Sequence, residues 1–477
     1  MRSLFRLKTI VAAEDQPEQH RMARTLSWPH LVAMGVGAIV GTGILTLIGV
    51  GADRAGPAVL LSFAVAGAIC ACAALCYAEM ATMIPASGSA YTYSYAVLGE
   101  IIAWFVGWSL ILEYSLVVST VAVGWSGYAV GFLKGLGIIL PDWMTHGPTL
   151  VTDGGMHLTN AGINVPAILI IAVVAGLLML GTRESARINS ALVILKIATL
   201  TLFVAVALPH FDAANLHPFA PSGFGSVADD HGVKYGVMGA AAIIFFAFYG
   251  FDAISTAAEE AKNPERDLAI GIVGSMVACT VIYIVVAAAA VGAVHYTVFS
   301  KSAEPLALIL RELGSGGLAT VVAAAAAIAL PTVLLAFLYG QSRIFLVMAR
   351  DGFLPPKLAA ISKRGTPARI TAVTAVFVAI LAGLLPLDVI ASLANAGTLV
   401  AFVAVAACVL VLRRRSPQAR RPFRTPFAWL VAPGAILGCC YLFMSLQRVT
   451  QVSFLIWNGI GLLVYFLYAR ARAVEGR

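Results

Sequence analysis

A run of closely spaced glycines interrupts an apolar stretch near residue 40. It reads Gly37-Ala38-Ile39-Val40-Gly41-Thr42-Gly43-Ile44. Because glycine is unfavourable inside a helix, this density predicts either a close packing face or a local unwinding. Unwinding would expose the amides of Thr42, Gly43 and Ile44 to an anion and the carbonyl of Ile39 to a cation. A free amino acid carries both of these charges.

A second apolar stretch is interrupted in a similar way. It reads Phe245-Phe246-Ala247-Phe248-Tyr249-Gly250-Phe251-Asp252. Asp252 falls in the middle of this stretch, where a carboxylate in a bilayer costs about 2.5 to 3.5 kcal/mol. It must therefore be protonated, paired or facing water. The aromatic run alone would equally fit core packing.

Two further ionisable residues lie inside apolar stretches. Lys196 is the only base placed deep within one, and Glu113 is the matching acid. A buried lysine loses its proton readily, so Lys196 is a candidate proton carrier, although a lysine nearer a helix end would simply reach the interface. We expect Glu113 and Lys196 to face one cavity. Glu79 fits an interfacial or packing acid.

The composition places these residues in a membrane protein. Of the 477 residues 60% are hydrophobic and 11% are charged, against roughly 25% charged in a soluble domain. Runs of about 20 apolar residues without strict alternation favour membrane-spanning helices over a barrel. The sequence predicts an all-α polytopic protein with twelve spans, near 31–51, 56–84, 97–131, 163–181, 188–208, 235–257, 268–294, 318–349, 369–386, 389–412, 427–446 and 450–469.

The basic residues predict the orientation of these spans. With the N-terminus inside, 24 of the 31 Lys and Arg fall in cytoplasmic segments. The positive-inside rule therefore predicts that both termini are cytoplasmic. The net charge of +8 is explained by topology, which argues against nucleic-acid binding.

The spans divide into two blocks of five with opposite orientation, which predicts an inverted repeat. The two glycine interruptions fall in the first span of each block. We expect a cytoplasmic segment at 1–27, a first repeat at 28–208, a second at 209–412, two added helices at 413–470 and a tail at 471–477.

Several motifs of the chain occur together. They are the first glycine run, Tyr77-Ala78-Glu79-Met80-Ala81, Ile84-Pro85-Ala86-Ser87-Gly88-Ser89-Ala90-Tyr91, Phe248-Tyr249-Gly250-Phe251-Asp252 with Glu259-Glu260-Ala261-Lys262-Asn263-Pro264, and Gln341-Ser342-Arg343 with Arg350-Asp351-Gly352-Phe353-Leu354-Pro355. Over about residues 27 to 470, the chain thereby resembles the amino acid, polyamine and organocation transporter superfamily, and within it the bacterial cationic amino acid transporters. The resemblance implies a leucine-transporter-type fold of five plus five spans with alternating access, coupling to protons or exchange, and a place in the inner membrane of a bacterium.

The resemblance also implies roles for individual residues. Backbone amides at Gly41, Thr42, Gly43 and Ile44 would hold a substrate carboxylate. A lysine at the position of Lys196 stands where sodium-coupled relatives bind their cation, which argues against sodium. Glu113 and Asp252 match acidic positions proposed for coupling or gating. The carbonyls expected to hold the substrate amine are those of Ile39, Phe246, Ala247 and Tyr249.

The sequence as a whole predicts a secondary transporter of L-amino acids coupled to protons, with no metal or other cofactor and with no enzymatic activity. Span eight reads Ala329-Leu330-Pro331-Thr332-Val333 and offers nothing negative to a basic side chain, which favours neutral substrates; Pro331 predicts a kink there. A cationic amino acid transporter, an amino acid/amine exchanger and a non-transporting sensor remain alternatives. The sequence leaves open whether a small accessory membrane peptide binds and what the oligomeric state is.

Overall fold

The computed structural model describes residues 6–8, 26–86, 88–152, 155–158, 162–180, 186–229, 232–258, 261–355 and 368–470. Most of the expected segment 1–27 and the tail 471–477 lie outside these residues. Within them the chain is almost entirely helical. Two short antiparallel hairpins complete it, β1 (Thr149–Thr152) with β2 (Gly155–Leu158) and β3 (Val227–Ala228) with β4 (Lys234–Tyr235).

Eight segments of the described chain are long and apolar enough to cross a membrane. The segments are built from α3 (Leu47–Ala55) with α4 (Val59–Met83), α6 (Glu100–Gly135), α8 (Ala186–Ala207), α9 (Val237–Ile244) with η7 (Phe245–Phe248) and α10 (Phe251–Thr256), α11 (Pro264–Ala293), α14 (Gly316–Ala329) with α15 (Pro331–Arg350), α17 (Leu387–Arg415) and α19 (Arg448–Val464).

Shorter elements accompany these segments. The shorter apolar helices are α1 (Trp28–Ile39), α7 (Val165–Leu180), α16 (Ala368–Leu384) and α18 (Ala428–Met444). Small connecting helices are α2 (Thr42–Leu45), α5 (Ser89–Val97), α12 (Tyr296–Phe299) and α13 (Pro305–Glu312). A helical multi-pass membrane protein is thus confirmed, while the count of twelve crossings and the inverted repeat stay predictions.

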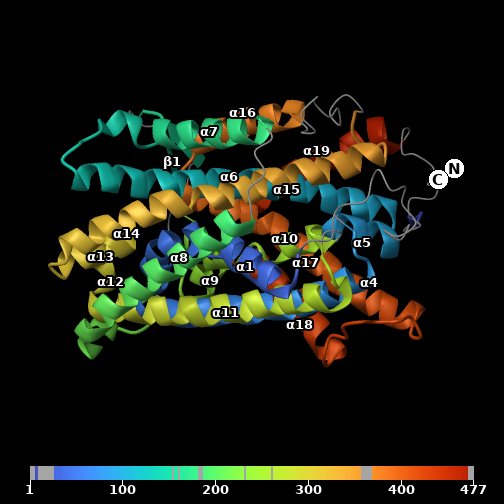
Figure 1. Ribbon diagram of the computed structural model, residues 1–477, viewed down its shortest axis with the longest axis horizontal. Helices are drawn as coiled ribbons and strands as arrows, with labels where there is room; N and C mark the ends of the chain where they lie inside the picture. The colour runs from blue at the N-terminus through green and yellow to red at the C-terminus, as the bar shows by residue number, and fades with distance from the viewer. Residues whose placement is uncertain are drawn as a thin grey trace.

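The helices lie side by side along the long axis of the molecule (Figure 1). α7 and α16 form one edge and α11 lies along the opposite edge, with α6 running between them. Burial distinguishes the centre of the molecule from its periphery. Of the residues in the apolar stretch of Val237–Thr256, 89% are buried, whereas 28% are buried in that of Arg448–Ala469. The α9–α10 segment therefore lies at the centre, and α19 faces outward.

Both helix interruptions predicted from the sequence are present. α1 ends at Ile39 and α2 begins at Thr42. η7 ends at Phe248 and α10 begins at Phe251, and between them Gly250 adopts a φ of 117° that a residue with a side chain rarely takes. The helix at span eight is also interrupted, at Leu330 directly before Pro331, because proline cannot donate the hydrogen bond that would continue it.

Candidate functional site

The two interruptions, called here the first and second break, lie against each other in the buried centre. A Cβ atom added to Gly43 would lie 2.2 Å from the Cα atom of Ala247. One added to Gly250 would lie 2.7 Å from Cβ of Ala38. Side chains at these two glycines would therefore push the backbones apart. The glycines allow the breaks to meet backbone against backbone.

The first break frees carbonyls at the end of α1, since the last turn of a helix has no following amides to bond. Two side chains from neighbouring helices take up this role. Nζ of Lys196, on α8, donates to the Gly37 carbonyl at 2.6 Å. The hydroxyl of Tyr283, on α11, donates to the Ile39 carbonyl at 2.7 Å.

The second break is supported from α17 and again from α11. Nδ2 of Asn395 donates to the carbonyls of Ala242 at 2.6 Å and Ile243 at 3.2 Å. Oδ1 of Asn395 accepts a hydrogen bond from the hydroxyl of Tyr249. The Tyr283 hydroxyl lies 2.9 Å from the Ala247 carbonyl. Of the carbonyls expected to hold an amine, those of Ile39 and Ala247 thus share one tyrosine.

The beginning of α2 presents donors rather than acceptors. The amides of Thr42, Gly43 and Ile44 lie in its first turn, where no preceding helical carbonyl can bond them. The Thr42 hydroxyl is buried and has no hydrogen-bond partner among the described residues. This arrangement has the polarity predicted for an anionic group, and Gly41 precedes it as the N-cap residue.

Asp252 is buried and paired. Its Oδ2 accepts from the hydroxyl of Tyr114, on α6, at 3.3 Å, and its Oδ1 accepts from the amide of Gly250 at 3.2 Å. It also lies in the first turn of α10, where the helix dipole favours a negative charge. Asp252 therefore ties the second break to α6.

Glu113 is also buried, but its Oε2 atom has no hydrogen-bond partner in the part of the chain that the structure describes. It faces α17, where a Cβ atom added to Gly397 would lie 3.0 Å from its Cβ atom. Lys196, by contrast, reaches α1. The two residues have different partners, so their expected shared cavity stays a prediction.

An apolar wall borders the first break. A Cβ atom on Gly41 would contact Val333 at 3.4 Å and Leu330 at 3.9 Å, on either side of the Pro331 interruption. On the second break the rings of Phe246 and Tyr249 lie 4.9 Å apart. The groups around the breaks therefore combine backbone donors, backbone acceptors and aliphatic side chains.

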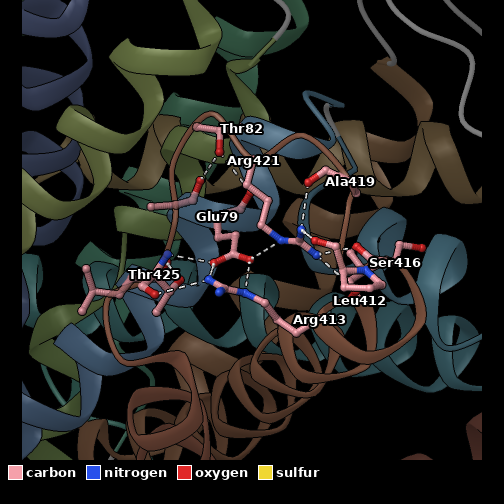
Figure 2. Close-up of polar contacts among 11 residues, drawn as sticks. Glu79, Thr82, Leu412, Arg413, Ser416, Ala419, Arg421 and Thr425 are labelled. Carbon is pink, nitrogen blue, oxygen red and sulfur yellow. Dashed lines mark hydrogen bonds and ion pairs between the residues drawn. The ribbon is translucent and has the colours of Figure 1, made fainter.

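Glu79 lies outside this site, at the end of α4, in a buried ion-pair network (Figure 2). Its carboxylate accepts from the guanidinium groups of Arg413 and Arg421 and from the amide of Thr425 at 2.8 Å. Arg421 also donates to the Leu412 carbonyl in the last turn of α17. The network fixes α17 and the following loop to α4. Glu79 therefore has a larger structural role than that of the interfacial or packing acid expected from the sequence.

Sequence reasoning missed the donors that support the breaks, Tyr283, Asn395 and Tyr114. Each is a polar group inside an apolar helix, and Asn395 stands out as an amide within Leu393-Ala394-Asn395-Ala396. A polar side chain in such a place needs a partner. The sequence therefore marked these polar residues as unusual, but it did not identify the groups that they bind.

Comparison with known proteins places the chain in a family. The sequence profile described as "Amino acid permease" matches residues 26–467. The chain belongs to the amino acid permease family. It is 44% identical over 472 residues to the branched-chain amino acid permease BcaP of Bacillus subtilis, covering 98% of each chain. It is 40% identical over 477 residues to the methylthioribose transporter of the same organism, covering 99% of each.

Plant relatives widen the comparison. The vacuolar cationic amino acid transporter 2 of Arabidopsis thaliana is 36% identical over 425 residues, 88% of this chain and 64% of that protein. These matches confirm the resemblance to the amino acid, polyamine and organocation superfamily. The relatives are permeases and transporters, not enzymes. The family implies an amino acid substrate and a place in the membrane.

Proposed function

We propose that this permease carries neutral L-amino acids with aliphatic side chains, branched-chain ones above all, across the inner membrane of a bacterium in symport with protons. One observation carries the proposal. The two breaks meet at Gly43 and Gly250, with free amides at the start of α2, carbonyls at the ends of α1 and η7, and aliphatic side chains beside them. The 44% identity to a branched-chain permease supports the same substrate class.

In this proposal each part of the substrate meets a group of matching chemistry. The amides of Thr42, Gly43 and Ile44 hold the carboxylate, because unbonded amides at a helix start attract anions. Carbonyls of the breaks hold the amine. Leu330 and Val333 contact the side chain. The carbonyls are those of Ile39, Phe246, Ala247 and Tyr249.

Transport then follows alternating access within twelve spans that form an inverted repeat, with both termini in the cytoplasm. A moving group of α1, α2, α4, α9, α10 and α11 rocks against α6, α7, α14, α15 and α16. Asp252 lies between the two groups, since α10 carries it and Tyr114 of α6 binds it. It serves as a gating contact.

Coupling to protons rests on Lys196 and Glu113. The Lys196 ammonium group holds the freed Gly37 carbonyl, so loss of its proton weakens the contact of α8 with α1. Glu113 is buried against Gly397 of α17 and has an oxygen without a described partner, so gain or loss of its proton changes how α6 packs against α17. Sodium has no part in this scheme, because a lysine already supplies the positive charge beside α1.

A second candidate substrate is a neutral sugar thioether. The 40% identity over 99% of both chains to a methylthioribose transporter favours it. Such a substrate has hydroxyl groups but neither carboxylate nor amine. It would use the free amides and carbonyls of the breaks as ordinary hydrogen-bonding partners.

Thermal unfolding of the purified protein with each of the twenty L-amino acids, methylthioribose and several polyamines, with and without sodium, tests the proposal. A ligand at about 100 times its Kd stabilises the folded state by about 2.7 kcal/mol. We expect stabilisation by leucine, isoleucine and valine that is independent of sodium. Stabilisation by methylthioribose alone, or by arginine, lysine or polyamines alone, would overturn the substrate class.

Reconstituted protein then separates the transport modes. Accumulation of leucine driven by an inward proton gradient supports symport. Uptake that requires a counter-substrate inside the vesicle and ignores the proton gradient would show an exchanger instead. Binding of leucine without any transport would show a sensor.

A further inference from the structure

One phenolic hydroxyl reaches both breaks. Tyr283 lies on α11, and its oxygen is 2.7 Å from the carbonyl oxygen of Ile39 and 2.9 Å from that of Ala247. Ile39 ends α1 before the first break, and Ala247 belongs to η7 before the second. A single side chain therefore links the backbones of two segments that are 208 residues apart in the chain.

The hydroxyl has one proton for two acceptors. A phenol donates one hydrogen bond, and each carbonyl oxygen accepts up to two. When Tyr283 donates to one carbonyl, the other has no proton from it. Both residues are buried, and a buried carbonyl without a donor is costly. The pair of carbonyls of Ile39 and Ala247 can therefore accept a further donor, and an ammonium group brings three.

Packing fixes the place of this hydroxyl. Tyr283 is fully buried, and its ring makes edge contacts with Phe63 of α4 and Phe248 of η7, with centroids 5.9 Å and 5.3 Å away. Aromatic pairs in this geometry favour one orientation of the ring. The oxygen is thus held between the two carbonyls by its surroundings.

We propose that Tyr283 is a positioning residue for the substrate amine. Its hydroxyl holds the carbonyls of Ile39 and Ala247 at a separation that an ammonium group can bridge, and it offsets the repulsion between their dipoles. The site then favours an amine over a hydroxyl at the substrate's α-carbon. This inference rests on the proposed function, because it takes the substrate to be an amino acid held at the breaks.

Tyr283→Phe tests the proposal, since it removes one oxygen and keeps the ring contacts. The probes are leucine and its 2-hydroxy analogue, 2-hydroxyisocaproate, as inhibitors of labelled leucine uptake in proteoliposomes. The readout is the preference for the amine, expressed as the inhibition constant of 2-hydroxyisocaproate divided by that of leucine. The loss of one positioning hydrogen bond is expected to lower this ratio about tenfold, with a higher KM and a smaller change in the maximal rate.

Tyr128→Phe is the matched control. The Tyr128 hydroxyl, on α6, also donates to a backbone carbonyl of the first broken helix, that of Leu45 at the end of α2. Its removal is expected to lower stability and to leave the amine preference unchanged. An unchanged ratio in Tyr283→Phe would overturn the proposal in favour of a purely structural tyrosine. An increased ratio would overturn it too, since the hydroxyl would then compete with the amine.

A second variant keeps the test valid if Tyr283→Phe does not reach the membrane. Phe63→Leu leaves every hydrogen-bonding group in place and removes a ring that orients Tyr283. Its amine preference is expected to fall in the same direction by about threefold, because the tyrosine gains freedom. No change in this variant would count against the proposal. Failure of wild-type protein to take up leucine at all would instead refute the proposed function.

Discussion

The carboxylate of Glu79 and the guanidinium of Arg413 lie 334 residues apart in the chain and form a two-point ion pair in the structure. Nε of Arg413 is 2.9 Å from Oε1, and Nη2 is 2.6 Å from Oε2. The side chain of Arg413 is 10% exposed and that of Glu79 is 1% exposed. Two parallel bonds of this kind fix direction as well as distance. α17 therefore has a defined register against α4.

Glu79→Gln is expected to destabilise the protein by about 3 to 5 kcal/mol, because it leaves Arg413 and Arg421 buried without a counter-charge. The matched control is Glu265→Gln, which breaks an ion pair on the surface, where the side chain of Arg420 is 81% exposed and that of Glu265 is 52% exposed. That change is expected to cost under about 1 kcal/mol. Equilibrium unfolding in mixed micelles measures both. Equal losses in the two variants would contradict the role given to the buried network.

The positions of the breaks could be predicted from the sequence because glycine residues and the run of aromatic residues affect the backbone at their own positions. Gly41 and Gly250 are the N-cap residues of α2 and α10, the helices that resume after the breaks. The partners could not be predicted, since Asn395 donates to a carbonyl 153 residues away and Tyr283 to one 244 residues away. Hydrophobic pattern marks which segments are helical, but it does not say which helix faces meet.

The arginines in the last turn of α17 and in the loop that follows illustrate the same limit. In the sequence they count only as positive charge that orients the spans. In the structure Arg413 and Arg421 converge on one buried carboxylate. Charge alone does not distinguish an arginine in water from one in an ion pair. The pairing depends on the loop that returns Thr425 to α4, where its hydroxyl donates to the Leu75 carbonyl.

Asn395→Leu is expected to abolish transport. The substitution leaves the carbonyls of Ala242 and Ile243 and the Tyr249 hydroxyl without their partner, at about 1 to 3 kcal/mol for each buried group. The second break then loses its support from α17. Asn458→Leu is the control, because Asn458 is also buried but bonds Ser109 and its own helix α19, away from the breaks. Uptake per folded molecule should fall only in the first variant; equal uptake in both would contradict this role.

Lys196→Met and Glu113→Gln are each expected to abolish leucine accumulation driven by a proton gradient. Counterflow should persist, since exchange of one substrate molecule for another needs no net proton movement. Lys301→Met is the control, because Lys301 is exposed, and it should keep both activities. Proton-driven accumulation at the wild-type level in both coupling variants would refute this assignment.

Gly43→Ala is expected to abolish transport and to destabilise the protein by about 1 to 3 kcal/mol through overpacking. The added methyl group would lie 2.2 Å from Cα and 3.1 Å from the backbone nitrogen of Ala247, so no flexible side chain can yield and the breaks must separate. Gly434→Ala is the control, because its methyl group would meet nothing within 4 Å on α18, and alanine favours a helix by up to about 1 kcal/mol. Leucine uptake and thermal unfolding of the two variants measure the contrast. Normal uptake by Gly43→Ala would mean that the backbone contact between the breaks is not needed for transport.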